Sequence, residues 1–97
     1  MIQNNAPHPG AELREKMKGR ITVTALAEHL GVPRMTLQKL VTGKIRMTAQ
    51  MALKLAEAFP HTTAEMWMDL QSRHELSRAM REHRNPVAHL QERAGKA

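Results

Sequence analysis

The stretch from Thr22 to Gly43 limits the fold of this chain more than any other part of its sequence. Apolar residues occur in it twice at the spacing i, i+3, i+4, which places them on one face of a helix. The two groups are Leu26, Ala27 and Leu30, followed by Leu37, Leu40 and Val41. Gly31 lies between them, where it can end the first helix in the left-handed conformation without a Cβ penalty. Two short helices joined by a turn that contains glycine form a helix-turn-helix motif.

The ends of both helices carry residue types that helix ends favour. Thr22 is a good N-cap, because its hydroxyl can accept a hydrogen bond from an amide of the first turn. Pro33 is expected to open the second helix, where its missing N–H costs nothing. Gly43 is expected to end that helix in the same way as Gly31 ends the first. Together these signals favour the motif over an ordinary solvated helical hairpin.

The outer side of the second helix indicates what the motif binds. When the apolar group at 37, 40 and 41 faces the core, the residues left on the outside and the flanks include no acid. Arginine, lysine and glutamine can hydrogen-bond guanine and adenine edges in the major groove of DNA. We therefore predict base contacts from Arg34, Met35, Thr36, Gln38 and Lys39.

Basic residues gather on and around the same motif. Between Lys18 and Arg46 there are six basic residues and a single acid, Glu28. A basic patch that coincides with a helix-turn-helix is the electrostatic footprint of nucleic-acid binding. The loop after the second helix is a usual place for phosphate contacts, and we predict such contacts from Thr22, Thr42, Lys44 and Arg46. A long basic helix with aromatic anchors, which a membrane surface would need, is not present.

Three more helices are predicted around the motif, so the fold expected is all-α with five helices. The first runs from Pro9 to about Met17, and the fourth from Ala49 to about Phe59 behind a Thr48 cap. The fifth starts at residue 62 or 63, with Thr62 and Glu65 as a candidate capping box, and runs to about residue 84. Residues 1–8 are expected to be a flexible arm, residues 9–84 the domain, and residues 85–97 a flexible tail.

The fifth helix is longer than a small domain needs. It carries a thin apolar edge. Either the helix frays at its end, or this edge contacts a partner. We predict that this edge forms a homodimer, through Leu76, Ala79 and Met80. A twofold dimer would place two reading helices about 34 Å apart and require an inverted-repeat operator.

The motif T-x-x-x-L-A-x-x-L-G-V-x-R-x-T-L-x-x-L-x-x-G resembles the lambda-repressor-like DNA-binding domain of phage repressors, Cro-like proteins and the wider xenobiotic-response-element family. Within that group, three more segments are similar to HigA antitoxins of bacterial toxin–antitoxin modules. They are HPGAELREKM (8–17), MTAQMALKLAEAF (47–59) and EMWMDLQSRHEL (65–76). Two positions depart from the pattern: Pro33 stands where the family usually has a capping Ser, and Val23 where repressors often place a polar phosphate contact.

The resemblance implies a dimeric antitoxin of a type II module. Such a protein represses its own operon by binding double-stranded operator DNA, and neutralises a HigB-like mRNA-cleaving toxin. Two other interpretations stay open. One is a plain helix-turn-helix repressor with no toxin, and the other is an adaptor whose basic face binds a protein.

Other classes of function find little support in the sequence. The chain has no cysteine, its six histidines lack zinc-site spacing, and no catalytic triad, paired carboxylates or Gly-rich phosphate loop stands out. We therefore expect no enzyme activity, metal or cofactor. The sequence has no apolar run long enough to span a membrane and no signal-peptide h-region. A cytoplasmic protein is expected.

Overall fold

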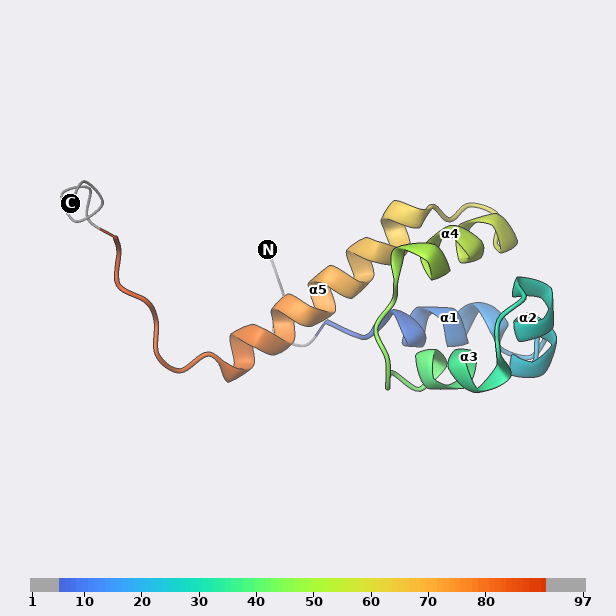
Figure 1. Ribbon diagram of the computed structural model, residues 1–97, viewed down its shortest axis with the longest axis horizontal. Helices are drawn as coiled ribbons and strands as arrows, with labels where there is room; N and C mark the ends of the chain where they lie inside the picture. Colours follow the sequence, from blue (N-terminus) through green and yellow to red (C-terminus); the bar gives the residue numbers. More distant parts are fainter. Residues whose placement is uncertain (1–5, 91–97) are drawn as a thin grey trace.

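The computed structural model describes residues 6–90, and these residues form five α-helices (Figure 1). In chain order they are α1 (Pro9–Met17), α2 (Val23–Leu30), α3 (Arg34–Val41), α4 (Ala49–Ala58) and α5 (Ala64–Glu82). The predicted all-α, five-helix architecture with a long last helix is confirmed.

Threonines set where three of the helices begin. The hydroxyl of Thr22 accepts a hydrogen bond from the backbone amide of Ala25, and Thr48 caps α4 in the same way. At α5 the capping residue is Thr63. The predicted capping box from Thr62 is wrong, because the Thr62 hydroxyl donates instead to the carbonyl of Phe59 in the preceding turn.

The turn between α2 and α3 has the expected geometry with one shift of position. Gly31 is left-handed, with a φ of 72°, and its amide bonds to carbonyls of the last turn of α2. Pro33 is the N-cap of α3 and not its first residue. Its ψ of 140° is extended, while its carbonyl already accepts the first hydrogen bond of the helix, from the amide of Leu37. Gly43, with a φ of 77°, follows the end of α3 as predicted.

The hydrophobic core lies where α1, α3, α4 and the first half of α5 meet. The side chains of Leu13, Leu37, Leu55 and Trp67 are fully buried there, one from each helix. The core is largely aliphatic, and α2 adds Leu26, Ala27 and Leu30 from the side. This packing fixes α3 by its inner face and leaves its outer face to solvent.

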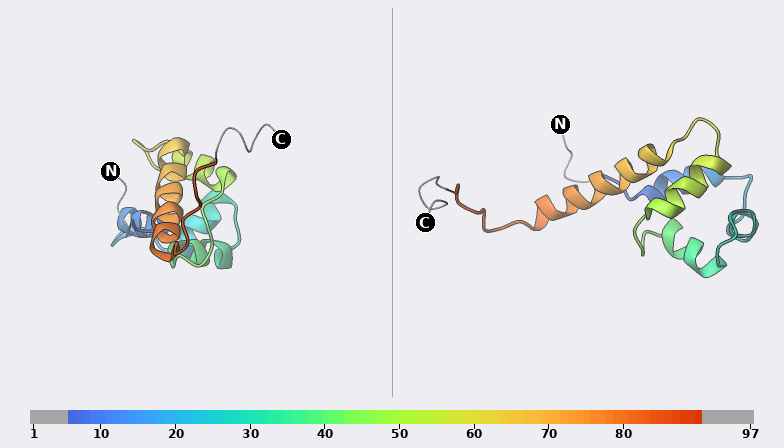
Figure 2. Two further views of the ribbon diagram at one scale, coloured as in Figure 1. Left: turned by 90° about the vertical axis from the view of Figure 1, so that its left-hand side faces the viewer. Right: turned by 45° about the horizontal axis from the view of Figure 1, so that its top comes forward.

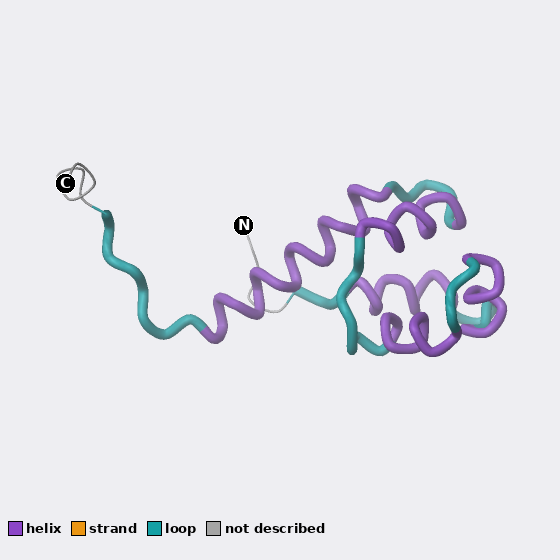
Figure 3. The backbone as a smooth tube through the Cα atoms, viewed as in Figure 1, coloured by secondary structure: helices purple, strands orange, loops and turns teal. Residues whose placement is uncertain are grey.

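The second half of α5 stands clear of the other helices (Figure 1, Figure 2). The helix has 19 residues, so it is about 28 Å long. It ends at Glu82, two residues before the predicted end near Arg84, where it has no helix to pack against and Asn85 precedes Pro86. Residues 83–90 are exposed and belong to no helix (Figure 3).

Ala6, in the predicted N-terminal arm, bonds to α5. The amide of Ala6 donates to the Ser77 hydroxyl at 3.0 Å, and its carbonyl lies 3.0 Å from Nδ1 of His74. Both partners are on α5, so the last residues of the predicted arm are tied to that helix. The rest of the arm, residues 1–5, and residues 91–97 of the predicted tail lie outside the described residues.

Gly10 allows α1 and α3 to approach each other closely. A Cβ at Gly10 would collide with the backbone carbonyls of Leu40 and Val41, which cannot move aside as a flexible side chain could. We predict that Gly10→Ala lowers the free energy of unfolding by about 1–3 kcal/mol, as overpacking does. Urea denaturation measures it, with exposed Glu15→Ala on the same helix as the control. An unchanged urea midpoint for Gly10→Ala would mean that α1 and α3 are not packed this closely.

Candidate nucleic-acid interface

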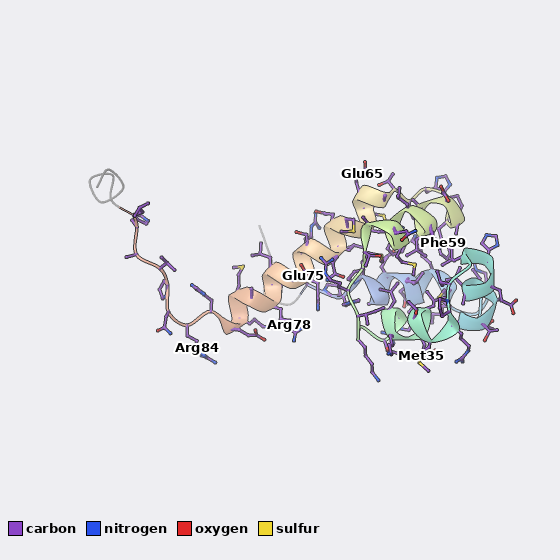
Figure 4. The ribbon with its side chains drawn as sticks, viewed as in Figure 1. Met35, Phe59, Glu65, Glu75, Arg78 and Arg84 are labelled. Carbon is purple, nitrogen blue, oxygen red and sulfur yellow. The ribbon has the colours of Figure 1, made fainter. Side chains whose placement is uncertain are left out.

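The outer face of α3 presents the predicted base-contacting residues. Because Leu37 and Leu40 are buried, Met35 and Lys39 are exposed on the opposite side, and Arg34 is exposed on the flank nearest α2. Thr36 and Gln38 are half-buried on the flanks. Met35 is 60% exposed and points away from the helical body (Figure 4). All five predicted residues thus belong to α3 and none is fully buried, and their contact with bases stays a prediction.

This face has no acid of its own. The sequence contains no Asp or Glu between His29 and Ala56, a range that covers all of α3 and the loop after it. The first turn of α3 also lacks an acid, although helix N-termini favour one. A polyanion such as DNA would therefore meet only neutral and positive side chains over this surface.

The side chains predicted to contact phosphates differ in whether they already bond to another group of the protein. Thr22 uses its hydroxyl as the α2 cap, and the Thr42 hydroxyl donates to the carbonyl of Gln38 at 2.8 Å. Within residues 6–90, the exposed Lys44 makes no ion pair. Lys44 is therefore the best placed of the four to meet a phosphate.

Arg46, the fourth predicted phosphate contact, is paired with an acid from α5. Its Nε lies 2.9 Å from the Glu75 carboxylate, which is on the side of α5 facing the loop (Figure 4). The hydrogen bond from Arg46 is the main reason why the pKa of Glu75 lies below its ordinary value, so the carboxylate stays ionised. Arg46 must share its guanidinium or leave Glu75 if it is to contact a phosphate.

His8 connects the basic loop, residues 43–47, to two helices. Its Nδ1 accepts a hydrogen bond from the amide of Gly10 at 2.9 Å, which caps α1. The other ring nitrogen must then carry the proton, and Nε2 donates to the carbonyl of Ile45 at 2.8 Å. The ring also meets His74 of α5 edge-on, with 5.0 Å between centroids.

Gln71 holds the same loop from the inside. It is 2% exposed, its Oε1 accepts from the amide of Met47 at 2.6 Å, and its Nε2 donates to Glu75 at 3.0 Å. Neither His8 nor Gln71 was predicted from the sequence to hold this loop. The Pro-Gly after His8 was a signal for a helix N-cap, and Gln71 follows Trp67 at i+4 on the inward face of α5.

An apolar cavity of about 330 Å³ lies between α2 and the end of α4, with His29 as its one titratable residue. Across residues 6–90, no three histidine or acidic side chains come together in a way that could hold a metal ion. In the same residues no helix is long and apolar enough to cross a membrane.

The geometry of His8 predicts a loss of stability in mild acid. Burial is the main cause that lowers the His8 pKa below 6.5, with Coulombic repulsion from His74 in the same direction and the bond to Ile45 and the charge of Glu75 opposing it. Protonation of the His8 imidazole is therefore less favourable in the folded state than in the unfolded state. We expect the free energy of unfolding to be highest above pH 6.5 and to fall as the pH drops below that value.

A pair of variants isolates this effect. His8→Asn retains an oxygen that can cap α1 but cannot titrate, so its stability should change less than that of the wild type between pH 7 and about 5. His29→Asn, the same substitution at an exposed histidine of α2, is the matched control. Chemical denaturation at each pH measures it. Parallel curves for the wild type and His8→Asn would contradict the assignment.

The sequence of this chain is similar to those of known helix-turn-helix proteins. A helix-turn-helix family model matches residues 11–66. Virulence-associated protein A′ of Dichelobacter nodosus is 38% identical over 74 residues, which are 75% of this chain and 64% of that protein. The chain thus spans less than two thirds of that relative.

Two solved structures are similar over most of their length. The first is an addiction-module antidote protein of the HigA family from Coxiella burnetii, with 31% identity, a TM-score of 0.76, and coverage of 80% of this chain and 86% of that one. The second is antitoxin HigA of Pseudomonas aeruginosa with the higBA promoter, with 35% identity, a TM-score of 0.74 and the same coverage.

Proposed function

The chain belongs to the helix-turn-helix family and has HigA-family antitoxins as structural neighbours, and on this basis we propose that it is a HigA-like antitoxin that binds operator DNA through α3. The observation that carries the proposal is the exposed, acid-free face of α3 with Arg34, Met35 and Lys39 on it. A family of this kind also agrees with the prediction that the chain is not an enzyme. Its place of action would be the cytoplasm, where its operator would lie.

The face of α3 suits the major groove, which is wide enough to admit an α-helix. Side chains at the start of α3 would reach base edges, while Lys44 and the basic loop would lie against the phosphates. Base contacts give specificity, and phosphate contacts give register and most of the salt dependence. One relative, HigA of Pseudomonas aeruginosa, has been solved with promoter DNA, which supports the same partner here.

We expect two classes of variant to separate these roles. Arg34→Ala or Lys39→Ala should weaken binding to the preferred operator by about 1–3 kcal/mol while changing non-specific binding much less. Lys44→Ala should weaken binding evenly across sequences and reduce the salt slope by about one. Fluorescence anisotropy over a range of salt concentrations measures both effects.

Arg84→Ala is the matched control, because it removes the same charge from the segment beyond α5 (Figure 4). Equal operator affinity for the wild type and an Arg34/Lys39 double variant would refute the assignment of α3. If no duplex binds at all, the adaptor interpretation takes its place.

The protein would act as a homodimer through the far half of α5. Leu76 and Met80 are 42% and 46% exposed, and Ala79 between them is exposed as well. A second copy that covered this edge would give the twofold symmetry that an inverted-repeat operator requires. Two α3 helices would then read half-sites about one DNA turn apart.

Charge on this edge should break the dimer without unfolding the domain. We expect a Leu76→Glu/Met80→Glu variant to be monomeric by light scattering at concentrations where the wild type is a dimer, because the interface would have to bury the glutamates of both copies without a cationic partner. Leu53→Glu, at an exposed leucine of α4, is the control. A wild-type monomer at high micromolar concentration, or a dimer that survives both glutamates, would exclude this interface.

The toxin partner would be a HigB-like mRNA-cleaving protein. This chain has a formal net charge of +6, and a toxin that binds RNA should be basic too, so long-range attraction would not bring them together. Binding would then depend on local acids and apolar contacts. Glu12 and Glu15 are exposed on α1, a helix outside the proposed reading helix, and are candidates for such contacts.

Co-expression with the neighbouring small open reading frame tests the antitoxin role. We expect that neighbour to stop growth alone and to be harmless when this protein is present. A Glu12→Lys/Glu15→Lys variant should bind operator normally yet rescue growth less well, with Glu65→Lys on α5 as the control. If the neighbour is harmless alone, or still toxic beside the folded protein, the chain is a plain repressor.

A further inference from the structure

The first residue of α3 is a cation, which helix stability alone does not explain. Arg34 occupies the first helical position, where the helix dipole is positive and acids are the stabilising residues. No acid in the first turn offsets this, and among residues 6–90 Arg34 forms no ion pair. The side chain is exposed, so packing does not require it either.

The guanidinium of Arg34 is nevertheless held in place by one contact with α2. Its Nε donates a hydrogen bond to the hydroxyl of Thr24 at 2.9 Å. The α2 helix does not need that hydroxyl for its own end, because Thr22 is the cap. Both residues are exposed, on consecutive helices of the motif. The bond therefore connects two surface side chains that have no structural duty elsewhere in the described chain.

The choice of nitrogen determines what Arg34 can still bind. A guanidinium has five N–H donors in one plane, one on Nε and two each on Nη1 and Nη2. With Nε bonded to Thr24, the paired donors that stay available are those of Nη1 and Nη2. Two parallel donors match O6 and N7 of guanine, both of which are acceptors in the major groove. Adenine presents an amino group beside its N7 and would oppose the second donor.

We propose that Thr24 is a positioning residue that holds Arg34 so that Nη1 and Nη2 contact one guanine in each operator half-site. This inference rests on the proposed DNA-binding function and adds to it a residue and a base. The Thr24 bond restricts a long, flexible side chain before DNA arrives, so less rotamer entropy is lost when the guanine contact forms. Thr24 acts on the base only through Arg34.

Substitutions that keep the shape of Thr24 test the proposal. Duplexes are first selected by the wild-type protein from a random pool, and their dissociation constants are then measured for each variant. Thr24→Val replaces only the hydroxyl, and should weaken binding to the selected duplex roughly three- to tenfold, the effect of one lost hydrogen bond. Thr24→Ser, which keeps the hydroxyl, should restore wild-type affinity. Thermal unfolding of all variants should coincide.

Two further measurements, one in the Arg34→Ala variant and one with a modified guanine, show whether Thr24 acts through Arg34 or contacts DNA itself. In Arg34→Ala, the further change Thr24→Val should cost no more affinity. Replacing the contacted guanine by 7-deazaguanine, which lacks the N7 acceptor, should weaken the wild type and Thr24→Ser more than Thr24→Val.

Two results would overturn the proposal while leaving DNA binding intact. One is an equal loss for Thr24→Val with and without Arg34, which would mean that Thr24 contacts a phosphate itself. The other is a fall in melting temperature with no loss of guanine preference, which would make the bond a link between helices only. If the wild type selects no duplex at all, the proposed function fails and this inference fails with it.

Discussion

Burial of Leu37 and Leu40 is the interaction on which the rest of this structure depends, because it fixes which side of α3 faces solvent. Both side chains are almost completely buried against α1 and the core. Gly10 lets the two helices come close enough for this packing, since any side chain there would meet the α3 carbonyls. The exposed row of Arg34, Met35 and Lys39 follows from that orientation. The chemistry of the proposed interface is thus a consequence of the packing on its opposite side.

A second layer of polar contacts holds the loop beside α3. His8 and Gln71 each bond to its backbone, and Glu75 bonds to both Gln71 and Arg46. Gln71 is the buried member of this set, and a buried polar group whose hydrogen bonds are satisfied defines one arrangement of a loop better than apolar contacts do. The loop carries Lys44, so these contacts also position a predicted phosphate contact. Part of α5 therefore serves the proposed DNA face, even though the helix is remote from the motif in sequence.

Much of this organisation could be predicted from the sequence, and the exceptions have physical causes. Helical spacing gave α2 and α3 and the exposed face, because a period of 3.6 residues is a local property. The Arg34–Thr24 and Arg46–Glu75 bonds were not predicted, since they join residues 10 and 29 positions apart whose distance depends on packing. The contacts of His8 with Ile45 and His74 were missed for the same reason, whereas its capping of α1 is local. Errors at Pro33 and Thr62 were shifts of one residue at helix ends, where neighbouring residues compete for the cap.

The central claim is that the outer face of α3 meets DNA, and the methionines of the chain allow one direct measurement. The chain has eight, and among those within residues 6–90 Met35 is the one on that face, whereas others such as Met17 and Met51 are in the core and Met80 is on the far half of α5. Methyl NMR of the methionines during titration with a selected operator duplex would report each site separately. If the outer face of α3 meets DNA, the Met35 methyl resonance should change most. An unchanged Met35 resonance at saturation, with large changes elsewhere, would contradict it.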